Sequence, residues 1–173
     1  VNIVDDGEQE PNETLDVVLS NAVGATIGTG TGVVTIEDND LAQITVDDVQ
    51  VNEGDGTVAV TVRKDIVTLT DVTVDILTIP GSATAPDDYQ AVLGSTVTIP
   101  AGALSAVADV TIVDDALDEA NETFTVQLSN NSQSNSQISD PSAVVTILDD
   151  DPTPDLSIDA TLSITESDVD TTS

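Results

Sequence analysis

Apolar and polar residues alternate along much of this chain. This period of two places successive side chains on opposite faces of a β-strand, so that one face is buried and the other is wet. Turn-forming residues separate the segments, and about seven short strands of this kind predict an all-β, antiparallel two-sheet sandwich. The alternating apolar positions are Val58, Val60 and Val62; Val72, Val74 and Ile76; Val97 and Ile99; Ala108, Val110 and Ile112; Phe124, Val126 and Leu128; and Val145 and Ile147.

The chain also repeats itself. Residues 1–21 and 110–130 share the pattern VxIVDD, ExNET and VxLSN without a gap, at an offset of 109 residues. Residues 33–40 and 144–151 share VVTI followed by acids, now at an offset of 111 residues. The extra residues fall in the loop between these segments, so one repeat has about 110 residues, which is an ordinary domain size.

The repeat pattern divides the chain into one complete copy and two partial ones. Residues 41–151 form the complete domain, residues 1–40 the C-terminal half of a preceding repeat, and residues 152–173 the N-terminal part of a following one. Two arrangements would protect the open edges of the partial sandwiches. Either the sequence is a window on a longer tandem array, or half-domains of different copies complete each other in a fibre. The connections between repeats are short, and Pro152 and Pro154 stiffen one of them.

Charge narrows the possible partners. The chain has 33 acidic residues, two basic ones (Arg63 and Lys64) and no His, for a net charge of -31. Nucleic acid is excluded as a partner because nothing neutralises phosphates, and no apolar stretch is long enough for membrane insertion. Hydrophobic residues are 39% of the chain, rich in Val, Ile and Leu, which argues against disorder. The absence of Cys and His excludes the usual zinc sites and disulfides.

Acidic residues gather where strand periodicity stops, including the stretch 115–123, which we expect to be a loop or a single turn. Alternate loops of a sandwich share one end, so these carboxylates should crowd together. Two like charges ~4 Å apart cost roughly 4 kcal/mol at an effective dielectric near 20, so the cluster calls for cations. Calcium fits best, because it takes several oxygen ligands in flexible geometry. The same register in two repeats argues against a merely solvated acidic surface: Asp5, Asp6, Glu10 and Glu13 correspond to Asp114, Asp115, Glu119 and Glu122.

The motifs resemble those of the Calx-beta domain. The matching pieces are Glu53 to Gly56, Asp88-Tyr89, Ile112 to Phe124, Leu128 to Asn130 and Val145 to Asp151. The resemblance implies an immunoglobulin-like sandwich of about seven strands with calcium at one end. In the complete copy the ligands it implies are Glu53, Asp88, Asp114, Asp115, Glu119, Glu122, Asp149, Asp150 and Asp151. In the preceding copy they are Asp5, Asp6, Glu10, Glu13, Asp38 and Asp40, and the following copy shows Glu166 and Asp168. Ala116 stands where the family motif often has a third acid.

These observations favour a structural or adhesive module over an enzyme. The carboxylate pairs Asp87-Asp88 and Asp114-Asp115 have no His or Lys partner for catalysis. Because Asp149 to Asp151 are both candidate ligands and linker, calcium at the junctions would stiffen a rod of neighbouring repeats. We expect an extracellular or cell-surface, bacterial setting. A calcium sensor within a larger protein and a metal-free spacer are the alternatives. A sugar-binding module is disfavoured by the single Tyr and single Phe. The sequons at Asn12 and Asn121 lie inside the family motif, which disfavours glycosylation there.

Overall fold

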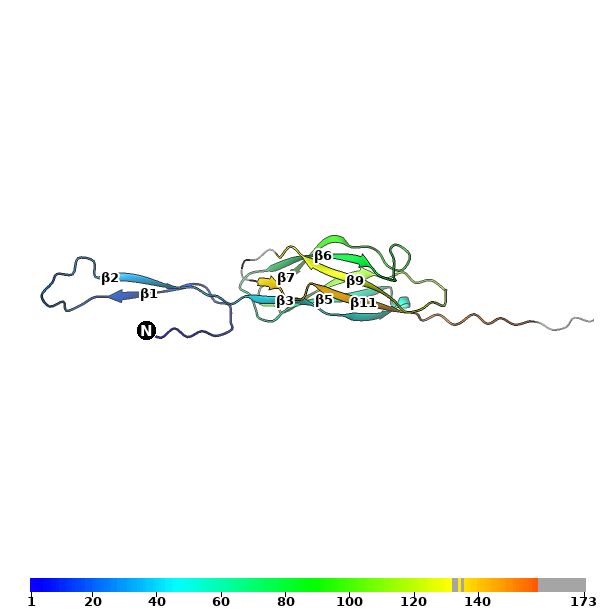
Figure 1. The fold of residues 1–173 in the computed structure, drawn as a ribbon, viewed down its shortest axis with the longest axis horizontal. Helices are drawn as coiled ribbons and strands as arrows, with labels where there is room; N and C mark the ends of the chain where they lie inside the picture. Colours follow the sequence, from blue (N-terminus) through cyan, green and yellow to red (C-terminus); the bar gives the residue numbers. More distant parts are fainter. Residues whose placement is uncertain (132–133, 135, 159–173) are drawn as a thin grey trace, which may run out of the picture.

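The computed structural model describes residues 1–131, 134 and 136–158 (Figure 1). Within these residues the elements are strands, apart from one 3-10 turn, η1 (Glu53–Asp55), and no helix is long and apolar enough to cross a membrane. The predicted all-β class is therefore confirmed. Residues 159–173, with Glu166 and Asp168, lie outside the described part. The strands are β1 (Glu13–Val18), β2 (Thr31–Ile36), β3 (Ala42–Val46), β4 (Val49–Asn52), β5 (Thr57–Lys64), β6 (Val72–Pro80), β7 (Leu93–Ile99), β8 (Ser105–Thr111), β9 (Glu122–Ser129), β10 (Ser136–Ile138) and β11 (Ser142–Leu148).

Strands β3 to β11 form a sandwich of two sheets, as the alternating pattern predicts. One sheet has the order β10-β3-β5-β8, and the other has the order β4-β11-β9-β6-β7. The alternating residues of β5, β6 and β9 point inward and are buried. Tyr89 and Phe124, the two aromatic side chains, are fully buried between the sheets and stack at 4.1 Å between ring centroids. The sandwich fold is confirmed, and the two rings are part of its core.

The strand count and strand directions differ in detail from the expectation. The segment before the predicted strand of Val58 to Val62 is divided at residues 47–48, so that β3 pairs with β5 in one sheet and β4 pairs with β11 in the other. One chain segment thus contributes a strand to each sheet. The β4–β11 and β10–β3 pairs are parallel, whereas the other pairs among the described strands are antiparallel. This division and the three-residue strand β10 account for the additional strands.

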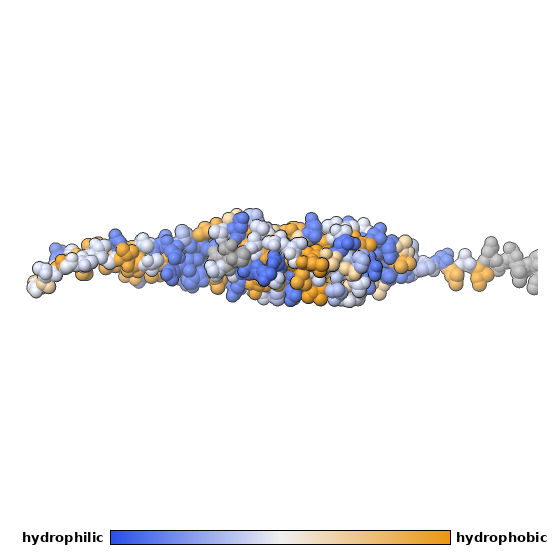
Figure 2. Space-filling model, turned by 90° about the horizontal axis from the view of Figure 1, so that it is seen from above, coloured by the Kyte–Doolittle hydropathy of each residue, from blue (hydrophilic) through white to orange (hydrophobic). Residues whose placement is uncertain are grey.

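Residues 1–40, here called the arm, extend from one end of the sandwich along the long axis of the molecule (Figure 1). Their β1–β2 hairpin has the same register as β9–β11. Glu13 pairs with Ile36 as Glu122 pairs with Ile147. Leu15 and Val34 pair as Phe124 and Val145 do in the sandwich. Hydrophilic residues gather at the narrow junction of the arm with the sandwich (Figure 2).

Candidate metal centre

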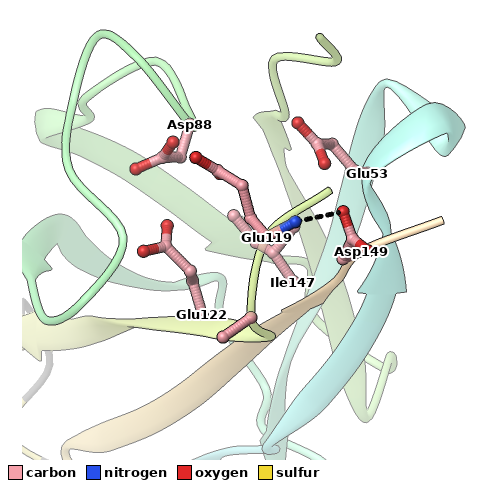
Figure 3. Close-up of a pocket in the computed structure, with 7 residues that line it drawn as sticks. Glu53, Asp88, Glu119, Glu122, Ile147 and Asp149 are labelled. Carbon is pink, nitrogen blue, oxygen red and sulfur yellow. Dashed lines mark hydrogen bonds between the residues drawn. The ribbon is translucent and has the colours of Figure 1, made fainter. Parts of the chain in front are cut away.

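The segments that carry the predicted ligands of the complete repeat meet at the end of the sandwich opposite the arm (Figure 1). Four segments meet there: η1, the β6–β7 connection, the β8–β9 connection and the tail after β11. Gly56, the last residue of the family motif that begins at Glu53, has φ 72° and ends η1 in the left-handed conformation that glycine adopts most easily. The stretch 115–123 is a loop up to the start of β9 at Glu122, as predicted. Figure 3 shows the carboxylates of these segments around one small pocket.

The first carboxylate cluster consists of Asp88, Glu119 and Glu122. One oxygen from each side chain lies within 4.8 Å of the others. Asp88 Oδ2 also accepts a hydrogen bond from the Thr84 backbone N–H at 2.6 Å, which fixes its side chain. Burial raises the pKa of Glu122, and the charge and hydrogen bond of Asp88 and the charge of Glu119 raise that pKa further. Three carboxylates at this spacing could hold a metal ion.

The second cluster consists of Glu53, Asp149 and Asp151, again with one oxygen each within 4.8 Å. Glu53 is only 8% exposed, and its Oε1 accepts the Asp115 backbone N–H at 3.2 Å. Burial raises the pKa of Glu53, the Asp115 hydrogen bond partly offsets this rise, and the charges of Asp115, Asp114 and Asp151 add to it. Burial is also the main cause that raises the pKa of Asp151, followed by the charge of Asp149.

The two clusters are adjacent. The Glu119 backbone N–H donates to Asp149 Oδ1 at 3.1 Å, so a residue of the first cluster is tied to a residue of the second (Figure 3). Within the described residues, Asp151 Oδ2 is buried and has no hydrogen-bond donor. A buried carboxylate oxygen without a partner is costly, and a bound cation would satisfy it. The oxygen-only donor set suits calcium better than zinc or copper.

No basic side chain neutralises these clusters. The chain's two basic residues lie at the C-terminal end of β5, away from η1. Arg63 forms an ion pair with Asp47, and Lys64 is buried beside Thr68. The negative charge at this end is therefore uncompensated by the protein. The donor set and the orphaned oxygen both fit the calcium expected from the sequence.

The remaining predicted ligands of the complete repeat lie around these two clusters. Asp114 and Asp115 act on Glu53 and Asp151 through their charge, and Asp115 Oδ1 accepts the Leu117 backbone N–H at 2.7 Å. Asp150 Oδ2 lies 2.9 Å from the position that a β-carbon on Gly54 would occupy, so its carboxylate rests against η1. Neither of the two close triads includes these three aspartates. Their role as ligands stays a prediction.

The predicted ligands of the arm also come together. Asp5, Asp6, Glu10, Glu13, Asp38 and Asp40 line one pocket at the junction with the sandwich. The charge of Asp6 raises the pKa of Glu10, with smaller contributions from burial, Glu13 and Asp38. Burial raises the pKa of Asp40, followed by the charge of Asp38. The arm therefore reproduces the crowding of the complete repeat.

One positioning residue was not recognised from the sequence. Asn121 Oδ1 accepts the Asp149 backbone N–H at 3.2 Å, and Asn12 Oδ1 accepts the Asp38 backbone N–H at 3.4 Å. From the sequence, both asparagines were interpreted as parts of a repeated motif and as sequons, with no role in positioning the tail. In each copy this hydrogen bond links the residue before one strand (β1 or β9) to the acidic segment after its partner strand (β2 or β11). The recurrence of Asn at both repeat positions was the available signal.

The chain resembles several solved structures, whereas comparison with curated proteins found no match. Among solved structures, the apo form of the Calx CBD1 domain shares 24% identity over 65% of this chain and 100% of its own, with a TM-score of 0.58. CBD12 from CALX1.2 shares 26% identity over 63% of this chain and 44% of its own, with a TM-score of 0.58. The calcium binding domain CBD12 of CALX1.1 shares 25% identity over 62% of this chain and 44% of its own, with a TM-score of 0.56.

The chain thus spans less than half of these two CBD12 chains. The model of one family, described as the Calx-beta domain, matches residues 1–40 and residues 36–151. The two matches together cover most of the sequence, and they include both acidic clusters of the sandwich and the acidic pocket of the arm. The chain belongs to the Calx-beta domain family.

Proposed function

We propose that this chain binds calcium through its clustered carboxylates at domain junctions, and that the bound ions stiffen a rod or filament of tandem repeats. The observation that carries the proposal is the position of Asp149 and Asp151. Asp149 and Asp151 share a carboxylate cluster with the buried Glu53, and they also form the strand-free connection that leaves the sandwich after β11. An ion bound there would fix the direction in which the chain leaves the domain.

The tandem organisation is part of the same proposal. Residues 1–40 are the end of a preceding repeat, residues 41–151 are a complete domain, and residues 152–173 begin the next. The common register of β1–β2 and β9–β11 supports this division, as does the hydrogen bond that an Asp backbone N–H donates to an Asn side chain in both copies. In a complete preceding repeat, Leu15 and Val34 would be buried as Phe124 and Val145 are buried here.

A stiff, acidic repeat of this kind serves an extracellular or cell-surface protein of bacterial origin, in an adhesive or filament-forming role rather than a catalytic one. The high net negative charge supports this role, because charge keeps a surface rod soluble before its carboxylates bind a cation. Neighbouring repeats, and other copies of the chain in a fibre, are the partners that follow.

The second candidate is a calcium-sensing regulatory module of a larger protein. The similarity to a structure named as a calcium binding domain favours it. In a sensor, calcium would change the angle between domains by a measurable amount, whereas in a rod it would mainly reduce the spread of angles. Small-angle scattering of the chain with calcium and with chelator separates these two outcomes.

Thermal unfolding of the whole chain tests calcium binding itself. Calcium at ~100 times its dissociation constant adds roughly 2.7 kcal/mol to the unfolding free energy. We expect a large upward shift of the melting temperature in calcium, and we expect changing both Asp149 and Asp151 to Asn to abolish it. Asp109→Asn, on the exposed face of β8, removes a charge outside the clusters and should leave the shift intact. Equal melting temperatures in calcium and chelator would leave the chain as a metal-free spacer.

A further inference from the structure

The arm is attached to the sandwich by a contact that involves none of the candidate metal ligands. Gln9 lies in a segment without regular secondary structure, between the exposed residues Glu8 and Glu10, yet it is only 8% exposed. Its side-chain oxygen Oε1 accepts a hydrogen bond from the Leu69 backbone N–H at 2.9 Å, across 60 residues of sequence. A polar side chain becomes buried in an irregular segment only where a partner satisfies it.

Hydrogen bonds from the sandwich and within the loop hold the loop that contacts Gln9 in place. It connects β5 with β6, and Lys64 at its start is only 3% exposed. The Lys64 ammonium donates to the Thr68 hydroxyl and to the Pro100 carbonyl at 3.3 Å. The Thr68 hydroxyl in turn donates to the Thr70 carbonyl at 2.7 Å, and the Gly102 N–H donates to the Thr68 carbonyl at 3.2 Å. The amide of Leu69, next to Thr68, is therefore presented in a fixed direction.

A buried lysine in this chain demands an explanation. Burying a cation costs several kcal/mol unless its hydrogen bonds are satisfied, and only two basic residues are available among 33 acids. Burial lowers the pKa of Lys64, and the charge of Asp71 partly offsets this effect. Lys64 makes no salt bridge in the described part of the chain, and its two hydrogen bonds both go to the loops at the arm-facing end. Its structural effect is thus to shape the surface that the arm contacts.

We propose that Gln9 and the loop of residues 65–71, supported by Lys64, form a calcium-independent clamp between consecutive repeats. The partner surface is a second domain of the same kind, recognised through one side-chain oxygen and one backbone N–H. The clamp sets the position of the arm before any ion binds. Because Glu10 follows Gln9 directly, the clamp also fixes the position of one residue that lines the acidic pocket of the arm.

The repeat register extends the clamp to the other end of the domain. Asp118 occupies the position of Gln9 and precedes Glu119 as Gln9 precedes Glu10. Its exposed carboxylate can accept the same kind of backbone N–H from a following repeat. An acceptor oxygen one residue before a candidate ligand is therefore a recurring feature of the junctions.

Amide exchange of the whole chain, measured by NMR in excess chelator, tests the clamp. Gln9→Met keeps the length and bulk of the side chain but removes its amide, and Gln127→Met makes the same change on the exposed face of β9. We expect Gln9→Met to speed exchange of the Leu69 amide roughly five- to tenfold, as the loss of one hydrogen bond predicts, and Gln127→Met to leave it unchanged. Amides of the β5 core should be unaffected by either variant, because Gln9 lies outside the sandwich.

Residual dipolar couplings of the same samples provide the second readout. In the wild-type chain, arm and sandwich should fit one alignment tensor without calcium, and in Gln9→Met they should need two. The clamp is refuted if Leu69 exchanges at the same rate in both variants and the wild type, or if arm and sandwich already align independently in the wild type. Because all samples contain chelator, the outcome of this test does not depend on whether the chain binds calcium.

Discussion

Replacing Glu122 with Gln should raise the stability of the domain without calcium and reduce the stabilisation that calcium adds. In chelator, Glu122 is one of three carboxylates whose oxygens lie within 4.8 Å of one another. Glu122→Gln keeps the shape of the side chain and removes one negative charge. If the cluster is a metal site, the same change removes a ligand from the calcium-bound form. A solvated acidic surface would show neither effect.

The size of the effect follows from the geometry. At 4.8 Å and an effective dielectric near 20, each like-charge pair that Glu122 forms with Asp88 and Glu119 costs about 3.5 kcal/mol. Partial exposure and salt screening reduce the combined relief to about 1–2 kcal/mol. For a domain of this size, each kcal/mol corresponds to a shift of roughly 4–8 °C in the melting temperature. In calcium, a tenfold loss of affinity would remove about 1.4 kcal/mol of the stabilisation that the bound ion adds to the unfolding free energy.

Thermal unfolding in chelator and in saturating calcium is the assay, with Asp109→Asn as the matched loss of one charge away from the cluster. We expect Glu122→Gln to melt above the wild type in chelator and to show a smaller calcium-induced shift than the wild type, with Asp109→Asn close to the wild type in both. A lower melting temperature of Glu122→Gln in chelator would refute the repulsion argument. An unchanged calcium-induced shift would show that Glu122 does not bind the ion.

Two further predictions concern the tail after β11. Because burial and neighbouring charges raise the pKa values of Glu53 and Asp151, the folded state binds more protons than the unfolded state between the ordinary and the raised pKa values. In chelator, stability should therefore rise as pH falls from 7 toward about 4, and in calcium it should fall because protons compete for the ligand oxygens; melting curves at several pH values check both trends. Asn121→Ala removes the hydrogen bond to the Asp149 N–H, which should cost about 1 kcal/mol and weaken calcium binding. Calorimetric titration of calcium should find the complete domain unaffected by the matched change Asn12→Ala, and equal losses in both variants would contradict this role.

Alternation of apolar residues was sufficient to predict the core, because each of these strands buries one face. Val58, Val60 and Val62 point inward from β5 as their spacing requires. The same pattern could not show that residues 42–52 divide between the two sheets, because Ile44 and Val51 are buried whichever sheet they join. Hydrogen-bond pairing decides that question, and pairing partners distant in sequence leave no periodic signal.

Sequence register predicted which acids gather, but not how they are grouped. The side chains of Glu119 and Glu122 both reach Asp88, whereas Asp149 and Asp151 reach Glu53. That division depends on the path of the loop after β8, which has no regular period to read. The contact of Gln9 was also invisible in the sequence, because its partner is a backbone N–H that any residue at position 69 would supply.

The arrangement of Gln9 and Glu10 separates two tasks that a calcium-dependent rod would otherwise combine. A junction held by carboxylates alone would separate without the ion, because crowded like charges repel each other. A neutral amide that accepts a backbone N–H contributes attraction that neither calcium nor salt alters strongly. Neighbouring domains would then stay in register when calcium is removed, and the ion would return to ligands that are already positioned. Calcium would therefore act on the stiffness of this junction and not on the choice of which surfaces meet.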